Sequence, residues 1–529
     1  MAQTQTRIRV QTSAERAAES RRFVMPNPGD MMMIMVFGWA LFCFFLVTLG
    51  NRLLIGLARL AKNDIYRSML LESGEVIGLI MVVGSVVLVI TIALAYRYPR
   101  IFLPVMLYSL VFANAGWRPV HDLTWIIKYL GVIYLGALTV MFAYKNIWRL
   151  VSIPYIRLVI VYLAWVGGVA VLVGGRSEDI WYASTEAVFF LGFSIAWLFV
   201  FSNKYGLEEF NKLIAWTAVV VTVTHMGAPF LMPKYIDQGR FTSYFPRATG
   251  FAFVFTPFVI SMFWMSMAHK NAQIRTFFLG CSSVALLLML WSGSRGPTAA
   301  VVMAVGILWL FFRSRALLVT FFLGALVIAT QLLFSLGANV ETSTLASRLQ
   351  SADTGRVDLW LSKLPITFQS PIYGFAPSDM RYIIVAEEKA AYLASLDLEA
   401  EGNTGIHSSY LGLALRFGYV GLGLFIALIV FAMKRGYEVL RSKKVPAHEK
   451  SVYILPVAML PAITFQAIFE DYIPGSGKGT VMSIVFYASL VISQVYGTRL
   501  LNEYERAGKS RLKLATVEGV ELIQHPEKA

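Results

Sequence analysis

Long apolar runs recur along almost the whole chain, and they constrain its fold more than any other feature. A run of about 17 to 25 apolar residues can cross the hydrocarbon core of a bilayer as a helix. We identify fourteen candidate spans in the 529 residues. They are residues 31–50, 76–95, 101–116, 125–143, 156–173, 182–201, 210–230, 249–268, 276–291, 297–312, 316–336, 410–432, 451–469 and 478–496. The sequence therefore predicts an all-α polytopic membrane protein.

The overall composition argues against other fold classes. Hydrophobic residues make up 57% of the chain and charged residues 15%, which is too little polar surface for a soluble protein of this length. The strands of an outer-membrane barrel would alternate polar and apolar residues, and the sequence shows no such alternation. Cys43 and Cys281 both lie inside apolar spans, so we expect small buried side chains and no disulfide framework.

The distribution of positive charge predicts how the chain is oriented. The net charge of +15 lies mainly in tails and short loops, which is typical of membrane-protein orientation and does not indicate a nucleic-acid partner. Loops on one face of the predicted bundle hold fifteen Lys and Arg residues, and loops on the other face hold six. Segment 51–75 goes against this trend with four, and we interpret it as an amphipathic surface helix. Both termini are therefore expected to be cytoplasmic.

This orientation divides the chain into five parts, and the long loop among them is external, or periplasmic if the cell is Gram-negative. The five parts are a basic cytoplasmic tail (1–30), transmembrane helices 1–11 (31–336), a long periplasmic or external loop (337–409), transmembrane helices 12–14 (410–496) and a second cytoplasmic tail (497–529). A connection as long as 337–409 is usually functional or disordered. It contains the amphipathic stretch "RVDLWLSKLPITF", whose Trp360 and Leu364 are expected to lie on the membrane.

Four arginines lie on the face where the sequence otherwise avoids positive charge. Arg295 sits in "SGSRG" between two spans, Arg240 and Arg247 sit in "GRFTSYFPRATG", and Arg356 follows "SADTG". Ionisable groups at membrane depth are costly and tend to mark functional sites. Because guanidinium groups bind phosphate oxygens bidentately and keep their charge, the pattern suits a lipid-linked diphosphate at the external headgroup level. No Asp, Glu and His cluster has metal-ligand spacing, so the arginines are expected to act without a metal.

A histidine lies at the external edge of the twelfth predicted span. His407 precedes "SSYLGLALRFGYVGLG", and an imidazole is well matched to accept a proton from a sugar hydroxyl. Ser408 and Ser409 are candidate caps for a helix that begins at Tyr410. We therefore interpret His407 as a candidate catalytic base, with an ordinary interfacial histidine as the alternative.

Other polar residues are candidate accessory groups, and each has an alternative structural role. Arg416 points into the same predicted cavity or pairs with a buried carboxylate. Glu470 and Asp471 either orient His407 and bind sugar hydroxyls, or belong to a solvated loop. For Arg240, a loop cation is preferred to a ligand as the interpretation. Arg295 and Arg356 themselves have alternatives as a snorkelling cation and as part of a surface anchor.

Four motifs appear in the order of a known family. They are "PRATGFAFVFTP" (246–257), "SGSRGPTAA" (292–300), "TGRVDLWLSKLP…SPIYGFAP" (354–377) and "GIHSSYLGLALRFGYVGLG" (405–423). Together they resemble the bacterial O-antigen ligases and the O-antigen or exopolysaccharide polymerases, which are inverting membrane glycosyltransferases with a GT-C-like helical fold. The resemblance covers about residues 246–432, and the N-terminal half matches only as a run of helices.

The resemblance implies a role for each matching residue. Arg295 and Arg356 match family arginines that engage the lipid diphosphate, Arg247 matches an earlier external arginine, and His407 matches the histidine that activates the acceptor hydroxyl. Ser408 departs from the pattern, because many relatives carry Asn there, and this leaves the subfamily open. The implied partners are an undecaprenyl-diphosphate-linked oligosaccharide donor, a glycan acceptor and the lipid bilayer, with no cofactor, metal or nucleic acid.

Three alternatives remain open at this point. A polymerase is preferred to a ligase because the additional helices and basic tails suit a protein that serves an export system, with a chain-length regulator as a further expected partner. A lipid-linked oligosaccharide flippase or secondary transporter would show an internal repeat and charges near the middle of the membrane. A membrane scaffold would retain its function after substitution of Arg295 and His407.

Overall fold

The structure is a computed structural model. It describes residues 99–112, 151–187, 206–231, 235–237, 240–245, 247–320, 356–377, 408–470 and 481–506, with a few isolated positions between them. Of the fourteen predicted spans, 31–50, 76–95 and 125–143 lie outside the described residues, as do most of 182–201 and 316–336.

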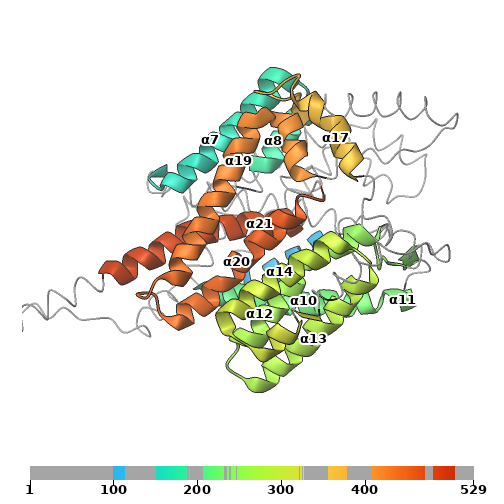
Figure 1. Ribbon diagram of the computed structural model, residues 1–529, viewed down its shortest axis with the longest axis vertical. Coiled ribbons are helices and arrows are strands. Elements are labelled where there is room, and N and C mark those ends of the chain that lie inside the picture. Colours follow the sequence, from blue (N-terminus) through green and yellow to red (C-terminus); the bar gives the residue numbers. More distant parts are fainter. Residues whose placement is uncertain are drawn as a thin grey trace, which may run out of the picture.

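The described residues form helices, apart from one short hairpin (Figure 1). The helices before the hairpin are α5 (Pro99–Phe112), α7 (Pro154–Val169), the π-helical segment η1 (Ala170–Gly174), α8 (Ser177–Ala187), α10 (Gly206–Met226) and α11 (Ala228–Leu231). Strands β1 (Ile236–Asp237) and β2 (Arg240–Phe241) pair antiparallel. After them come α12 (Ala248–Ala268), α13 (Ala272–Trp291), α14 (Arg295–Phe312), α17 (Arg356–Thr367), α19 (Ser409–Arg441), α20 (Ala447–Gln466), α21 (Val481–Val491) and the π-helical segment η3 (Ile492–Tyr496).

Seven helices in the described part of the chain are long and apolar enough to cross a membrane. They are Pro154–Gly174, Leu207–Phe230, Ala248–Ala268, Ala272–Trp291, Arg295–Phe312, Ser409–Arg441 and Met482–Arg506. Each contains or closely overlaps one predicted span, and α20 occupies the predicted span 451–469. The helices are consistent with the predicted all-α, multi-pass membrane protein. Two of them run further than predicted: α19 continues to Arg441, and the last helix continues to Arg506.

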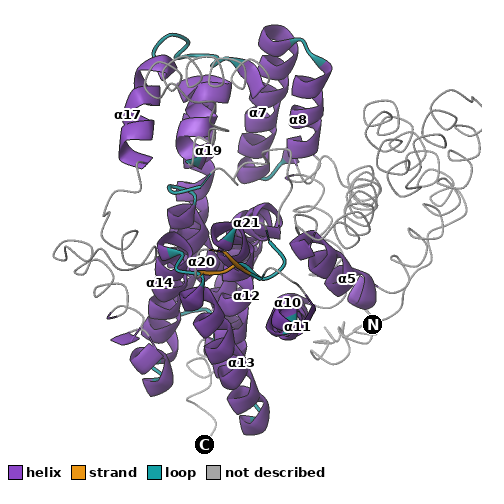
Figure 2. Ribbon diagram, turned by 90° about the vertical axis from the view of Figure 1, so that its right-hand side faces the viewer, coloured by secondary structure: helices purple, strands orange, loops and turns teal. Residues whose placement is uncertain are grey.

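Helix α12 is the central helix of one group, and α10, α13, α14 and α20 pack around it (Figure 2). Nearly all of α12 is buried, since its sequence is apolar on every side and presents no polar face to solvent. In helix α13, by contrast, only 22% of the residues are buried, as expected of a helix that faces lipid. A second group consists of α7, α8, α17 and the first part of α19.

Helix α19 is broken near its start. Gly418 has φ 68° and ψ −178°, a backbone conformation that is essentially restricted to glycine. The turn that follows α17, residues 370–375, fits against this break, and the main-chain amide of Phe375 donates a hydrogen bond to the carbonyl oxygen of Leu415 at 2.8 Å. A Cβ atom at Gly418 would collide with the backbone of this turn. The motif "SPIYGFAP" is therefore the segment that docks on α19.

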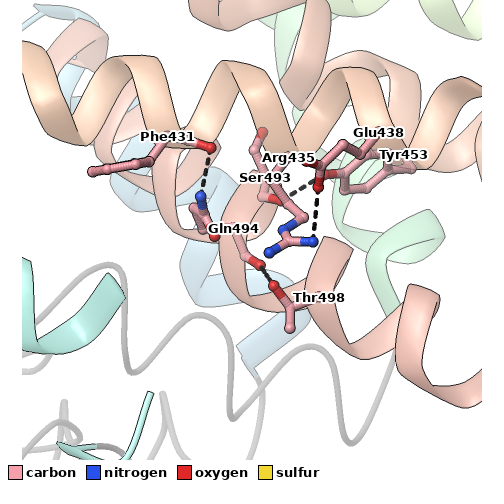
Figure 3. A network of polar contacts seen from close by, with 7 residues as sticks. All are labelled: Phe431, Arg435, Glu438, Tyr453, Ser493, Gln494 and Thr498. Atoms are coloured by element: carbon pink, nitrogen blue, oxygen red, sulfur yellow. Dashed lines mark hydrogen bonds and ion pairs between the residues drawn. The ribbon is translucent and has the colours of Figure 1, made fainter. Parts of the chain in front are cut away.

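A polar network joins α19, α20 and the last helix near the C-terminal end of α19 (Figure 3). The π-helical turn η3 presents the carbonyl oxygen of Ser493 to the hydroxyl of Tyr453, which donates a hydrogen bond at 2.5 Å. The side-chain amide of Gln494 donates to the carbonyl oxygen of Phe431, and Arg435 pairs with Glu438 at 2.8 Å. These contacts fix three helices at the end of α19 that lies away from Ser409.

Candidate functional site

The link between α13 and α14 is a turn of three residues, Ser292, Gly293 and Ser294, and Arg295 is the first residue of α14. Gly293 has φ 62°, in the left-handed region that favours glycine. The hydroxyl of Ser292 donates to the carbonyl oxygen of Met289 at 2.6 Å. Both serines are buried, whereas Arg295 is only partly buried. The tight turn predicted at Arg295 is thus confirmed.

Arg240 lies across this turn. Its Nε atom donates to the carbonyl oxygen of Ser292 at 2.6 Å, and its Nη2 atom donates to the hydroxyl of Ser294 at 3.2 Å. The next residue, Phe241, stacks on Trp291 at the end of α13 with ring centroids 5.0 Å apart. The hairpin β1–β2 therefore packs on the turn through the Arg240 side chain and on the end of α13 through the Phe241 ring. The interpretation of Arg240 as a loop cation did not anticipate these contacts, which build its guanidinium group into the turn before Arg295.

Phe469, just after α20, is the point where the starts of three helices meet. A Cβ atom at Gly296, in the first turn of α14, would lie 3.4 Å from the Phe469 ring. Trp360 of α17 lies against the same ring, with centroids 6.3 Å apart. The hydroxyl of Ser409, at the start of α19, donates to the carbonyl oxygen of Glu470 at 2.8 Å. We refer to Gly296, Trp360, Ser409, Phe469 and Glu470 as the Phe469 junction.

Some of the predicted site residues lie at or near this junction in the chain. Arg295 is adjacent to Gly296, and Arg356 begins α17 one helical turn before Trp360. His407 lies outside the described residues, and the described chain resumes one residue later at Ser408. Of the two residues expected on the membrane, Leu364 is exposed but Trp360 packs on Phe469 within the protein. The contacts of the junction thus join residues that are 173, 109 and 61 positions apart in the sequence.

The structure confirms Ser408 as the predicted helix cap, and it also shows the surroundings of Glu470 and Arg247. The Ser408 hydroxyl accepts a hydrogen bond from the amide of Leu411, and α19 begins at Ser409. Glu470 is only 7% exposed, so a solvated loop is the wrong interpretation for it. Asp471 lies outside the described residues. Arg247 occupies the N-cap position of α12, where its side chain is exposed and caps no amide.

Arg416 is buried inside the bundle, at 5% exposure. It donates from Nη1 to the hydroxyl of Tyr182 in α8 at 3.1 Å, and its guanidinium carbon lies 5.5 Å from the centroid of the same ring. Neither alternative from the sequence anticipated this partner. The contact instead joins the first part of α19 to α8.

Several buried polar residues at this end of the helices were missed in the sequence. Lys363 is only 3% exposed, and its spacing of seven residues from Arg356 puts both on one face of α17. Glu186 of α8 is fully buried and accepts a hydrogen bond from the hydroxyl of Tyr487 in α21. The spacing in α17 was a usable signal for Lys363. Glu186 carries no comparable signal, because its partner is 301 residues away.

This arrangement is suited to binding a polyanion at one end of the helices. The guanidinium group of Arg295, at the start of α14, matches phosphate oxygens in charge and donor arrangement. Within the residues that the structure describes, no group of three or more His, Cys, Asp or Glu side chains could hold a metal ion.

Comparison with known proteins gives one family match. Residues 280–426 match the family model described as O-antigen ligase. The matched segment includes α14, α17 and the first part of α19, which are the helices whose starts meet at the Phe469 junction. No curated protein shows a significant match to the chain. The match confirms the family resemblance that was recognised in the sequence motifs.

Proposed function

We propose, from the premise that this chain carries an O-antigen ligase domain over residues 280–426, that it is a glycosyltransferase acting at the outer face of the bacterial inner membrane. The donor is a glycan linked to undecaprenyl diphosphate, and the acceptor is a hydroxyl group of a second sugar. The observation that carries the proposal is the Phe469 junction. There the helix starts that bear Arg295 and Arg356 lie beside the start of α19, which His407 precedes in the chain.

The reaction is an inverting substitution at the anomeric carbon of the donor. The acceptor oxygen forms a bond to this carbon while the bond to the diphosphate oxygen breaks, and undecaprenyl diphosphate leaves with both electrons of that bond. His407 accepts the proton of the acceptor hydroxyl, which is the role best matched to an imidazole. No nucleotide sugar takes part, because the lipid diphosphate is already an activated leaving group.

The arginines stabilise the charge that develops on the leaving diphosphate. Arg295 and Arg356 bind its oxygens, and Arg247 at the start of α12 supplies a further cation. Fixed cations in a partly water-excluded site favour a transition state in which negative charge accumulates. We propose that these groups do the work for which many transferases use a divalent metal, so that a chelator leaves the rate unchanged.

Two reactions of the same class fit this site. The large number of predicted spans and the basic tails favour an O-antigen or exopolysaccharide polymerase, whose acceptor is another lipid-linked repeat unit. The description of the matching family model favours an O-antigen ligase, whose acceptor is the lipid A-core. Deleting the gene distinguishes them: loss of a polymerase leaves single repeat units on the final acceptor, whereas loss of a ligase makes lipid-linked polymer accumulate.

The direct test uses the purified protein in detergent with a lipid-linked oligosaccharide. Longer lipid-linked chains, formed with or without a chelator, are expected from the wild-type protein. Arg295→Ala is expected to reduce the rate by about a hundredfold or more. Arg275→Ala is the matched control, since Arg275 is an exposed arginine at the other end of α13.

Three results would count against the proposal. Dependence of the rate on a divalent ion would exclude the mechanism in which arginines act alone. Equal activity of Arg295→Ala and Arg275→Ala would remove Arg295 from the site. Movement of the intact lipid-linked oligosaccharide across a vesicle membrane, without any transfer, would indicate a flippase instead.

A further inference from the structure

Arg240 contacts both ends of the turn that leads into Arg295. Its Nε and Nη2 atoms reach Ser292 and Ser294, which lie on either side of Gly293. Because a guanidinium group is planar and its donors are fixed in a fork, this pair of contacts holds the two serines at a set separation. Ser294 is bonded directly to Arg295, so the fork also sets the position from which the Arg295 side chain leaves the backbone.

The turn at Gly293 is closely packed against the Arg240 side chain. Gly293 has φ 62°, and a Cβ atom built on it would lie 3.3 Å from Nε of Arg240. The Arg240 side chain, from its Cγ atom to Nε, therefore lies close to Gly293. Glycine is needed here for its left-handed conformation and for this close approach. On the α14 side, the hydroxyl of Thr298 donates to the carbonyl oxygen of Ser294 at 2.8 Å and continues the same chain of contacts.

The hairpin that carries Arg240 is itself anchored in the bundle. Phe241 stacks on Trp291 and meets Phe251 of α12 edge-on, with centroids 5.2 Å apart. Ser243 has a left-handed φ of 54°, and its hydroxyl shares a 2.6 Å hydrogen bond with Nδ1 of His225. His225 is 1% exposed and packed among aromatic rings, so it ties the hairpin to the end of α10.

Tyr244 adds a second contact between the hairpin and α10. Its hydroxyl donates to the carbonyl oxygen of Thr224 at 3.2 Å. Burial, and to a lesser degree the neighbouring Tyr108, raises the pKa of Tyr244 above its ordinary value, so the phenol keeps the proton that it donates. Two adjacent hairpin residues thus bond to two adjacent residues of one helix.

We propose that Arg240 is a positioning residue for Arg295, and that the hydrogen bond between His225 and Ser243 anchors the hairpin from which Arg240 acts. Arg240 does not bind the donor in this scheme; it sets the turn so that Arg295 faces the Phe469 junction. The inference rests on the proposed function only for what Arg295 binds. The positioning itself can be measured without any substrate.

The test is a double-mutant cycle on Arg240 and Ser294 with two separate measurements. The variants are Arg240→Gln, Arg240→Lys, Ser294→Ala and the double variant Arg240→Gln with Ser294→Ala. The controls are Arg275→Gln and Ser283→Ala, which change exposed residues of α13 away from the turn. Amide hydrogen exchange over residues 289–298 reports the turn, and binding of undecaprenyl diphosphate without sugars reports the diphosphate subsite.

The positioning role predicts a defined pattern. Arg240→Gln should raise exchange at residues 292–296 about tenfold while α12 stays protected, and should weaken lipid diphosphate binding by a similar factor. Arg240→Lys should recover part of the protection, since an ammonium group can reach only one of the two acceptors. Ser294→Ala should have a smaller effect, and none at all when added to Arg240→Gln. Both controls should behave as wild type.

The outcomes separate this inference from the proposed function. Weaker lipid diphosphate binding with unchanged exchange at residues 292–296 would make Arg240 a ligand and overturn the positioning role. Additive effects of the two substitutions would overturn it as well. Faster exchange with unchanged lipid diphosphate binding would support the positioning role and count against Arg295 as a diphosphate ligand, and therefore against the proposed function.

Discussion

Tyr419 donates its main-chain N–H to the carbonyl oxygen of Pro371 at 2.7 Å, one residue past the break in α19. In an unbroken helix this amide would bond to a residue four positions earlier in α19. The turn after α17 therefore supplies the hydrogen-bond acceptor that α19 lacks at Gly418. The break is stabilised by a partner from another part of the chain, so it is a fixed feature of the fold.

Gly418→Ala is expected to destabilise the protein by about 3 kcal/mol, because alanine is strained at φ 68° and its Cβ would collide with Ile372. Gly423→Ala in the same helix is the control. Gly423 has open space around it, and alanine there should be neutral or stabilising by up to about 1 kcal/mol. Thermal unfolding in detergent measures both. Equal melting temperatures for the two variants would show that α19 tolerates a continuous helix.

Phe469→Ala is expected to lower transfer activity at least tenfold and to cost about 1–3 kcal/mol of stability, because one ring joins α14 to α17. Ile468→Ala is the control, since Ile468 is the exposed preceding residue, and it should change stability by less than about 0.5 kcal/mol. A rate assay and a melting curve on both variants check this. If Phe469→Ala kept full activity, the Phe469 junction would have no part in catalysis.

Tyr182→Phe is expected to destabilise the protein by about 1–3 kcal/mol, because Arg416 loses a hydrogen-bond acceptor in a buried setting while the ring stays in place. Tyr437→Phe is a close control. Arg441 donates to Tyr437 in the same way, but Tyr437 is 60% exposed, and that change should cost less than about 0.5 kcal/mol. Chemical or thermal unfolding compares them, and equal losses would contradict the distinction drawn from burial.

His407→Ala is expected to lower kcat by about 10²- to 10⁴-fold while binding of the lipid-linked donor stays unchanged, since a general base acts on the acceptor proton. His448→Ala is the control, because His448 is an exposed histidine at the other end of α20. Separate measurements of donor binding and single-turnover rate check the split. Loss of donor binding with an intact rate at saturation would assign His407 to the donor side.

The positions of several helices are visible in the sequence. The spans at α12, α13 and α14 agree with prediction closely, because each apolar run is bounded by polar loop residues on both sides. The prediction ended α19 at residue 432, since Lys434 and Arg435 looked like the start of a loop. They instead belong to the helix, which continues to Arg441, and Arg435 pairs with Glu438 within it.

The features that were missed depend on contacts distant in sequence. The break at Gly418 cannot be seen in "RFGYVGLG", because the turn that stabilises it lies more than 40 residues upstream. The role of Arg240 was hidden for the same reason, since its acceptors are 52 and 54 residues away. Local caps were predictable: Ser408 was identified as a cap because its acceptor role depends only on the next three residues.

The break at Gly418 divides α19 into two parts whose tilts in the membrane need not be the same. The long segment from Tyr419 to Arg441 is bonded to the last helix, and we expect the two to tilt together to match bilayers of different thickness, as membrane helices generally do. The short segment before Gly418 is hydrogen-bonded to the turn after α17. The break at Gly418 limits how far a tilt of the longer segment is passed on to this short one. A change of lipid chain length should therefore alter the tilt of the segment after Gly418, while Ser409 keeps its hydrogen bond to Glu470.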